Sequence, residues 1–302
     1  MLTLRHLKIF LWVCNTGNMT AAAEKLYMTQ PSVSQAIAEI ERHYEVKLFE
    51  RLGKKLYITL AGKRLLSYAN HIINLNEEIE REMRELRNNG SIRIGASVTV
   101  GTYVLSEIIK EFRKVNPIAK IQSIVDNTKV VEEMLLDDRV DLGLVEGIIH
   151  SEDLIANPFM NDELVLICNP EHDWAKTGYI EPSQIDGAGF IVREEGSGTR
   201  ELFDSLMRAN GVKWYPTWIC NNSETIKNAV EAGMGISIIS KMSVEREAAD
   251  GKLVIVDIKG IGFKRMFNFV YHKNKYISDT MISFIDIIRT KGHRIGSETT
   301  RS

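Results

Sequence analysis

Two short loops combine hydroxyl side chains with glycine at the start of a helical pattern. Residues 97–102 follow one apolar run, and residues 194–200 follow another. Hydroxyl groups, free backbone N–H groups and the positive end of a helix together form a site for a small anion. The alternative interpretation is ordinary helix capping, which uses the same residue types. The candidate ligand contacts in these loops and at neighbouring strand ends are Ser97, Val98, Thr99, Thr102, Glu146, Gly196, Ser197, Gly198, Thr199 and Ser223.

A second polar run lies near the N-terminus, where two short helical patterns are separated by a turn. Residues 19–27 form the first pattern and residues 30–43 the second, with a break at Met28 and Thr29. Two helices joined in this way are typical of a helix-turn-helix, whose second helix places short polar side chains against base edges. An ordinary cap followed by a solvated face is the alternative. The candidate DNA contacts are Thr29, Gln30, Pro31, Ser32, Ser34 and Gln35.

A basic turn follows between two short runs that alternate like strands, residues 46–51 and 56–59. The pattern predicts a β-wing with Arg51, Lys54 and Lys55 at its tip. Such cations contact phosphates, and an arginine can also enter a minor groove.

The motifs of this region resemble those of the LysR-type transcriptional regulators. They are, in order, residues 21–26 (AAAEKL), 29–35 (TQPSVSQ), 48–51 (LFER) and 59–62 (TLAG). The resemblance implies a DNA-binding domain followed by a two-lobed sensor in which the loops at 97–102 and 194–200 face each other. Residues 194–201 resemble the corresponding segment of LysR-type members linked to sulfur assimilation or carbon fixation, whose effectors are small anions. An oxyanion such as sulfite or sulfate is therefore the expected effector, with a phosphorylated metabolite second. Glu146 suits such a site only if its side chain points away or engages Arg193 or Arg200.

The element that joins the two regions is predicted to be one long helix over residues 60–88, capped by Thr59. Its apolar positions step by four and three residues, which is a heptad pattern and favours pairing with a second copy. The alternative is a single helix packed on its own domain. The heptad positions are Leu65, Ala69, Ile72, Asn76, Ile79, Met83 and Leu86.

After residue 90 the pattern alternates between strands and helices, which predicts a largely parallel sheet covered by helices. Strands are expected at 91–96, 120–125, 140–145, 163–168, 189–193, 216–220, 235–240, 253–256 and 266–271, and helices at 102–115, 128–136, 199–209, 224–231 and 277–288. Residues 290–302 are polar and are expected to be a frayed tail. The acidic residues at 137, 138 and 141 are expected in a solvated turn rather than at a cation site.

The sequence therefore predicts an N-terminal all-α winged helix-turn-helix domain and a C-terminal α/β domain of two subdomains. By resemblance, the second domain is similar to a type 2 periplasmic binding protein. The expected boundaries are 1–59 for the DNA-binding domain, 60–89 for the dimerisation helix, 90–161 with 265–302 for subdomain I, and 162–264 for subdomain II.

The charge distribution supports this division, although the chain of 302 residues carries a net charge of only −2. Residues 1–66 hold ten basic and five acidic side chains, a net charge of +5, which leaves −7 for the remainder. Such asymmetry is typical of a basic nucleic-acid-binding module attached to an acidic body.

Several other functions find no support in the sequence. A P-loop, a complete dinucleotide fingerprint, a G-x-S-x-G elbow and a zinc-type histidine pair are all missing from it. We expect no enzyme activity, no cofactor and no metal. A signal peptide and an apolar run of membrane-spanning length are also missing, and the three cysteines are far apart, so we expect a cytoplasmic protein with no membrane contact.

The resulting hypothesis is a sequence-specific transcriptional regulator that responds to a small anion bound between two subdomains. Its expected partners are double-stranded DNA with a pseudo-palindromic operator, the effector, and further copies of itself in a dimer or tetramer. The alternatives are a cytosolic small-molecule binding protein without a DNA function and a regulator that responds to a non-anionic metabolite. The operator, the target genes, the sign of regulation and the effector's identity stay open.

Overall fold

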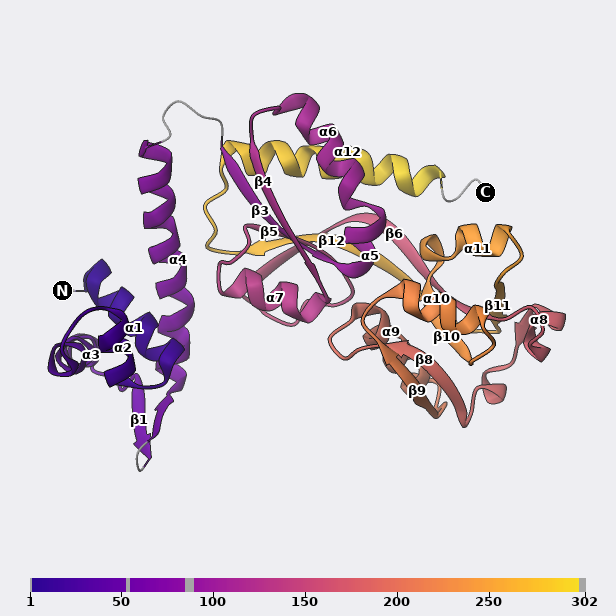
Figure 1. Cartoon of the computed structure of the whole chain (residues 1–302), viewed down its shortest axis with the longest axis horizontal. Helices are drawn as coiled ribbons and strands as arrows, with labels where there is room; N and C mark the ends of the chain where they lie inside the picture. Colours follow the sequence, from indigo (N-terminus) through magenta and orange to yellow (C-terminus); the bar gives the residue numbers. More distant parts are fainter. Residues whose placement is uncertain (1, 53–54, 85–89, 299–302) are drawn as a thin grey trace. The chain divides into compact units, whose positions relative to one another are not determined.

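The computed structural model describes residues 2–52, 55–84 and 90–298. Their contacts divide the chain into two compact units. The first unit is built on the N-terminal part of the chain and also includes the short segments Leu136–Asp138 and Asn274–Tyr276. The second unit contains most of the chain beyond residue 90. Figure 1 shows the elements of both units in sequence colours.

The first unit is the predicted winged helix-turn-helix with the predicted long helix behind it. Its elements are α1 (Leu4–Thr16), α2 (Met19–Lys25), α3 (Gln30–Tyr44), β1 (Phe49–Leu52), β2 (Lys55–Ile58) and α4 (Leu60–Arg84). Asn18 begins α2 by accepting the N–H groups of Thr20 and Ala21 on Oδ1, at 2.8 and 3.2 Å. The small residues Ala22 and Ala23 are buried, which lets the helices approach closely.

The wing and helix α4 are joined tightly at Thr59 and Gly62. Thr59 Oγ1 donates to the Lys47 carbonyl at 2.6 Å and accepts the Gly62 N–H at 3.0 Å. A Cβ at position 62 would overlap the Leu48 carbonyl oxygen and come within 2.6 Å of Ile58 Cγ1. Glycine is therefore required where α4 crosses the base of the wing.

The predicted heptad face of α4 serves two purposes. Ala69 is fully buried in the core of the first unit, together with Ile73, which lies off the heptad pattern. Further along, the exposed fractions of Ile72, Ile79 and Met83 are 42%, 53% and 64%. The start of the helix thus packs in the core of its own unit, whereas Ile72, Ile79 and Met83 each keep a large exposed fraction. Leu86 and the rest of the predicted helix beyond Arg84 lie outside the described residues.

The second unit is built on a long mixed sheet with the strand order β4-β3-β5-β12-β6-β10-β8-β9. Its strands are β3 (Ser91–Ser97), β4 (Lys120–Asp126), β5 (Leu142–Glu146), β6 (Leu154–Cys168), β7 (Tyr179–Ile180), β8 (Ala188–Arg193), β9 (Trp214–Cys220), β10 (Ile236–Ser240), β11 (Val254–Ile258) and β12 (Lys264–His272). Its helices are α5 (Val98–Tyr103), α6 (Leu105–Val115), α7 (Thr128–Leu136), α8 (Asp173–Thr177), α9 (Gly198–Ala209), α10 (Ser223–Glu231), α11 (Glu245–Ala249) and α12 (Asp279–Glu298). The predicted parallel pairs are present, since β3 pairs in parallel with β4 and β5, and β8 with β9 and β10.

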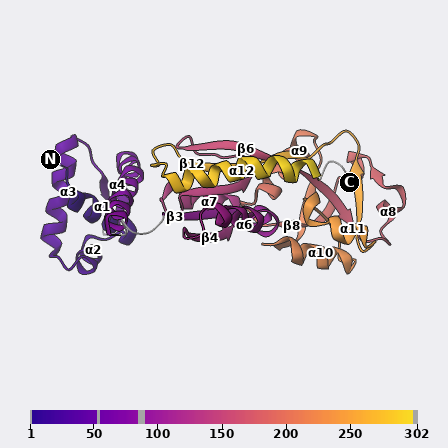
Figure 2. The same ribbon diagram turned by 90° about the horizontal axis from the view of Figure 1, so that it is seen from above.

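Two antiparallel strands, β6 and β12, run through the middle of this sheet and separate two sets of core residues. Phe159 and Met160 of β6 pack in one hydrophobic cluster with β3, β5 and α12, whereas Leu164 and Leu166 pack in another with β8 and β10. We call these two halves lobe I and lobe II. Figure 2 shows α12 lying along β6.

Three expectations for the chain beyond residue 90 were wrong. The helix expected at 102–115 is two helices, because the backbone of Val104 (φ −121°, ψ −43°) departs from helical geometry between them. The tail expected to fray from residue 290 is helical as far as Glu298, and Gly292 packs directly against the Phe159 carbonyl. The acidic turn is not solvated, since Asp138 and Asp141 are 2% and 7% exposed and both form ion pairs.

Among the described helices, none combines the length and the apolar character that crossing a bilayer requires.

Candidate functional site

The recognition-helix candidate is α3, whose start is fixed by Thr29. Thr29 Oγ1 accepts the Ser32 N–H at 3.4 Å and lies 2.8 Å from Ser32 Oγ. The apolar face of α3 is buried through Val33, Ala36, Ile37 and Ile40, so the polar face is turned to solvent. On that face Pro31, Ser32 and Gln35 are exposed, and Gln30 and Ser34 are half-buried.

One exposed aromatic side chain beside this helix was not expected from the sequence. Tyr27 lies in the turn between α2 and α3 with 98% of its surface exposed and with φ of 53°. A bulky residue in the left-handed region of backbone space is uncommon, and full exposure of a tyrosine removes the stabilisation that its burial would give. The sequence could have pointed to Tyr27 through its place in the turn at residues 26–29, because that turn had to lie beside the recognition helix.

The wing is held against α3 by a carboxylate. Glu41 accepts the backbone N–H groups of Leu48 and Phe49 at 2.9 and 3.3 Å and the Lys47 ammonium at 2.7 Å. Arg51 is exposed on β1, opposite Leu56 of β2. Lys54 lies outside the described residues, and Lys55 is described only as the first residue of β2.

In lobe I of the second unit, the predicted ligand residues gather around Glu146, the last residue of β5. Ser97 donates a short hydrogen bond to Glu146 Oε2, and Thr99 Oγ1 donates to Oε1 at 3.2 Å. Thr128 Oγ1 donates to the Glu146 carbonyl at 3.0 Å. Each of these four side chains is at most 3% exposed. The carboxylate therefore points into the predicted site and organises its hydroxyl groups.

In lobe II, the predicted loop packs directly against the end of β5. Gly198 lies so close to Glu146 that a Cβ there would overlap the Glu146 carbonyl oxygen, and a Cβ at Gly147 would come within 3.1 Å of Gly198 Cα. Ser197 stands at the N-cap position of α9 and is 1% exposed, but its Oγ caps no backbone N–H. That oxygen has no hydrogen-bond partner among the described residues. The loop supplies an unsatisfied hydroxyl at a helix N-terminus.

Two buried arginines complete the cluster. Arg193, the last residue of β8, is 2% exposed and donates to Glu194 through Nε and Nη2 at 2.8 and 2.9 Å. Arg265 of β12 is 8% exposed and donates to Asp162 at 2.7 Å and to Thr199 Oγ1 at 3.0 Å. Within the described part of the chain, Arg193 Nη1 and Arg265 Nη2 have no hydrogen-bond partner.

These arginines were not among the predicted site residues. Arg193 entered the sequence argument only as a possible partner for a carboxylate, and Arg265 did not enter it. The available signal was an arginine at an inward-facing position of an apolar strand, since Arg265, Phe267 and Phe269 alternate with more exposed neighbours along β12.

The electrostatics of the cluster are dominated by burial. Burial raises the pKa of the Glu146 carboxyl, while the positive charges of Arg265 and Arg193 act in the opposite direction. The negative charge of Asp162 adds to the rise. The uncharged form of Glu146 is therefore favoured relative to an ordinary glutamate, and a protonated carboxyl is a hydrogen-bond donor.

The remaining predicted ligand residues are placed differently. Thr102 is exposed and donates to the Val98 carbonyl at 2.7 Å, so the structure does not bring it into the cluster. Val98 is half-buried as the first residue of α5. Gly196 adopts φ of 86° and packs against Lys129, and Ser223 is buried as the first residue of α10.

Three further contacts join the lobes around this cluster. The Lys129 N–H donates to the Gly196 carbonyl at 3.0 Å, and Tyr103 Oη donates to Glu224 Oε1 at 3.2 Å. His150 Nε2 lies 2.7 Å from Glu201 Oε1 on α9, while its Nδ1 lies 3.5 Å from Glu132 on α7. The pKa of His150 is raised, and its hydrogen bond to Glu201 is the main cause. Both predicted loops contact Glu146, the first through Ser97 and Thr99 and the second through Gly198.

The arrangement suits ligand recognition. Its hydroxyls, arginines and helix terminus can bind a ligand, and no group of three or more His, Cys, Asp or Glu side chains in the described ranges has the geometry to hold a metal ion. A winged helix-turn-helix and a two-lobed domain with a buried polar cluster, joined in one chain, are typical of ligand-responsive DNA-binding proteins.

The comparison with protein families agrees. Residues 4–63 match the bacterial regulatory helix-turn-helix proteins of the lysR family, and residues 86–292 match the LysR substrate binding domain. The chain belongs to the LysR family of transcriptional regulators and carries its effector-binding domain.

Relatives and solved structures cover most of the chain. The uncharacterized HTH-type transcriptional regulator YeiE of Escherichia coli K12 is 36% identical over 285 residues, covering 94% of this chain and 96% of that one. Full-length OxyR of Pseudomonas aeruginosa has a TM-score of 0.66 at 19% identity, with 96% and 95% of the two chains covered. The CcmR regulatory domain of Synechocystis in complex with 2-PG has a TM-score of 0.63 at 27% identity, and it covers 68% of this chain and 98% of that one.

Proposed function

We propose that this LysR-type regulator responds to a small oxyanion, such as sulfite or sulfate, bound beside Glu146 between the two lobes. A phosphorylated metabolite is the second choice within the same chemistry. The observation that carries the proposal is a set of three buried donors without partners among the described residues: Arg193 Nη1, Arg265 Nη2 and Ser197 Oγ. Buried polar groups are normally hydrogen-bonded, and an oxyanion supplies several acceptors in a small volume.

The charges of the cluster are compatible with an anion when Glu146 is protonated. Glu194 and Asp162 already balance Arg193 and Arg265, so the charge of the occupied site depends on Glu146. Its raised pKa favours the neutral form, which donates a hydrogen bond instead of repelling the ligand. Thr199 stays paired with Arg265 and positions that guanidinium.

The CcmR complex supports a small-molecule ligand for this domain, because a regulatory domain 27% identical to this one was solved with the small molecule 2-PG. A regulator of a non-anionic metabolite is the competing proposal. Glu146 favours it, since a charged carboxylate between the lobes would accept hydrogen bonds from a polar or cationic ligand.

Calorimetry on the purified full chain tests the proposal with sodium sulfite, sulfate and phosphate, and with sodium chloride as the control salt. We expect one of the oxyanions to bind, and a Thr99→Ala/Ser197→Ala variant to bind it at least about tenfold more weakly, since a hydrogen bond to a charged group contributes about 1.5–3 kcal/mol. Ser183→Ala, at an exposed position of lobe II, is the matched control. No heat with any oxyanion, or undiminished binding by the double variant, would overturn the proposal.

On DNA, the proposed base readers are Ser32, Ser34 and Gln35, which lie along the solvent face of α3 with Thr29 and Pro31 at its start. Gln30, Arg51, Lys54 and Lys55 are proposed to contact phosphates or the minor groove. At present Gln35 Nε2 donates to Glu39 Oε1 at 2.9 Å, a bond that a base edge could replace.

The proposed active form is a homo-oligomer assembled through α4, either a dimer or a tetramer. The exposed apolar residues Ile72, Ile79 and Met83 occur at the predicted heptad positions and would be covered by a second copy. Two DNA-binding units per dimer imply a pseudo-palindromic operator.

A further inference from the structure

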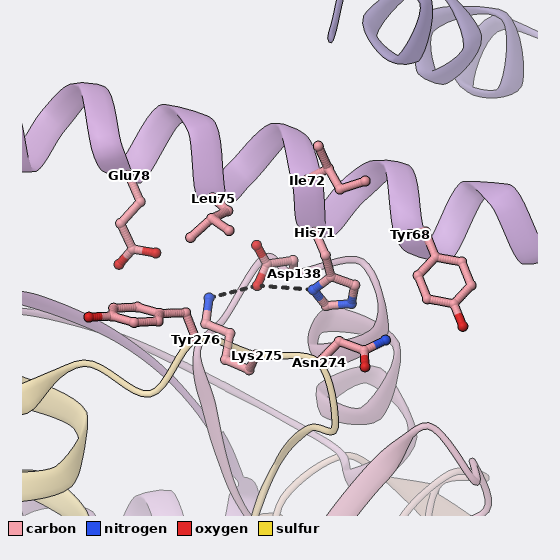
Figure 3. A pocket seen from close by; sticks show the side chains of 9 residues that line it. All are labelled: Tyr68, His71, Ile72, Leu75, Glu78, Asp138, Asn274, Lys275 and Tyr276. Atoms are coloured by element: carbon pink, nitrogen blue, oxygen red, sulfur yellow. Dashed lines mark hydrogen bonds and ion pairs between the residues drawn. The ribbon is translucent and has the colours of Figure 1, made fainter. Parts of the chain in front are cut away.

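A buried ion-pair cluster lies against helix α4, far along the chain from the helix-turn-helix motif. The Lys275 ammonium is 2.8 Å from Asp138 Oδ1, and His71 Nδ1 of α4 lies 3.9 Å from the same oxygen. The exposed fractions of the Lys275, Asp138 and His71 side chains are 7%, 3% and 9%. Figure 3 shows Lys275 and His71 both pointing toward Asp138 at the wall of a pocket of about 160 Å³.

Asp138 is held to α4 by its backbone as well. Its carbonyl accepts Asn74 Nδ2 at 3.1 Å, so two α4 side chains, Asn74 and His71, engage one residue. Asp138 also adopts φ of 53°, a left-handed conformation that a non-glycine residue enters at some cost. The surrounding contacts must hold it there, which makes the position sensitive to movement of the adjoining chain.

The adjoining chain leads on both sides to the proposed effector site. After Asp138 the chain enters β5, which ends at Glu146. Before Lys275 it leaves β12, which contains Arg265 near its beginning. The two strands pair antiparallel, with Val270 opposite Gly143 at one end and Phe267 opposite Glu146 at the other. One strand pair therefore has the effector-site residues at one end and the α4-bound segments beyond the other.

We propose that the Asp138–Lys275–His71 cluster couples the effector site to helix α4 through the paired strands β5 and β12. The proposal rests on the proposed function for the nature of the ligand, but the route itself is a property of the chain. A hydrogen-bonded strand pair moves as one body, because sliding one strand would break its register. A shift at Glu146 and Arg265 therefore reaches Asp138 and Lys275 together.

A buried ion pair suits this role because it is either formed or broken when the strands move, without stable intermediate separations. Separating Lys275 from Asp138 would break a buried ion pair, which is strongly unfavourable. The pair either follows the strands and changes its contact with His71 and Asn74, or it resists their movement. In the first case the structure of α4 changes with the state of the effector site, and in the second the contact with α4 opposes the change at that site, so the two are coupled either way.

Hydrogen–deuterium exchange on the full chain tests the coupling, with peptides that cover residues 68–79 of α4 as the readout. Two perturbations are applied at the effector site: saturating sodium sulfite, and the substitution Glu146→Gln, which needs no ligand. We expect exchange in α4 to change by about twofold to thirtyfold, the range that corresponds to typical coupling free energies. In Lys275→Met the change in α4 is lost, while peptides of β5 and β12 still respond.

The matched control is Lys273→Met, since Lys273 pairs with Asp153 at 2.6 Å and lies two residues from Lys275. We expect it to respond as the wild type does, and Lys275→Arg, which keeps the charge, to restore much of the response. If Lys275→Met does not fold, His71→Leu interrupts the cluster from the side of α4 and gives the same readout. An α4 response of equal size in the interrupted variants, or no α4 response in the wild type while β5 and β12 change, would overturn the coupling. If sulfite changes no peptide but Glu146→Gln changes α4, the oxyanion proposal fails and the coupling is supported.

Discussion

Arg265 and Asp162 lie directly opposite each other in the antiparallel pair of β12 and β6, and their side chains form a buried ion pair. Arg265 Nε is 2.7 Å from Asp162 Oδ2, and both side chains are 3% exposed. Ser240 Oγ donates to the second carboxylate oxygen at 2.7 Å. The pair stands where the two lobes meet and fixes a guanidinium that still has an unused N–H among the described contacts.

Replacing Asp162 with asparagine should destabilise the protein severely. The substitution keeps the shape of the side chain but leaves Arg265 charged and buried, and breaking such a pair typically costs about 3–5 kcal/mol. Chemical denaturation followed by circular dichroism measures the free energy of unfolding. Asp173→Asn, at an exposed ion pair, is the control and should change it little. A loss at position 162 no larger than the control's would show that the pair is not important for stability.

The pH dependence of stability should carry the signature of Glu146. Its folded-state pKa is raised, so its contribution to stability is fully present below its ordinary value of 4.5 and is lost as pH rises through the folded pKa. Glu146→Gln removes this loss. The unfolding free energy of the variant relative to the wild type should therefore increase with pH above 4.5, which denaturation at a series of pH values measures. A constant difference would mean that Glu146 titrates normally.

Gly62→Ala should separate the wing from α4. The added methyl group overlaps the Leu48 carbonyl and the Ile58 side chain, and overpacking of this kind typically costs about 1–3 kcal/mol. Calorimetry should show a lower melting temperature for the first unit, together with weaker DNA binding. Gly262→Ala places the same methyl group in open space and should leave the melting temperature unchanged.

Gln35→Ala and Arg51→Ala should affect DNA binding in different ways. Loss of a base reader relaxes sequence preference, whereas loss of a phosphate contact weakens binding to all sequences and reduces the slope of affinity against salt by about one. Fluorescence anisotropy with an operator fragment and a scrambled fragment, at several salt concentrations, separates the two effects. Unchanged preference in Gln35→Ala would remove it from the base readers.

Elements governed by local signals were predictable from the sequence. Thr29 and Asn18 cap the helices that their residue types indicated, and the helix at Thr128–Leu136 was predicted with its observed bounds. Ser97, Thr99 and Ser197 came from the same kind of signal, a hydroxyl between a strand and a helix. Capping chemistry acts over three or four residues and is therefore visible in the sequence.

Relationships between distant residues were not predictable in this way. Arg265 meets Asp162 and Thr199 only because β12 returns between β5 and β6, at a separation of 103 residues from Asp162. The burial of Asp138 depends in the same way on Lys275. A run of acidic residues is normally solvated, so the local pattern indicated the wrong environment. The break between α5 and α6 was likewise not predictable, because residues 103–105 contain neither glycine nor proline.

Strand β6 has a consequence for how the sensor unfolds. Its 15 residues supply side chains to the cores of both lobes, and β12 pairs with it across their junction. Loss of either core removes packing from a strand that the other core also needs. The two lobes should therefore unfold in one cooperative transition, and neither should be stable as an isolated fragment. Rotation of one lobe against the other is possible by bending the shared strands, but independent melting is not.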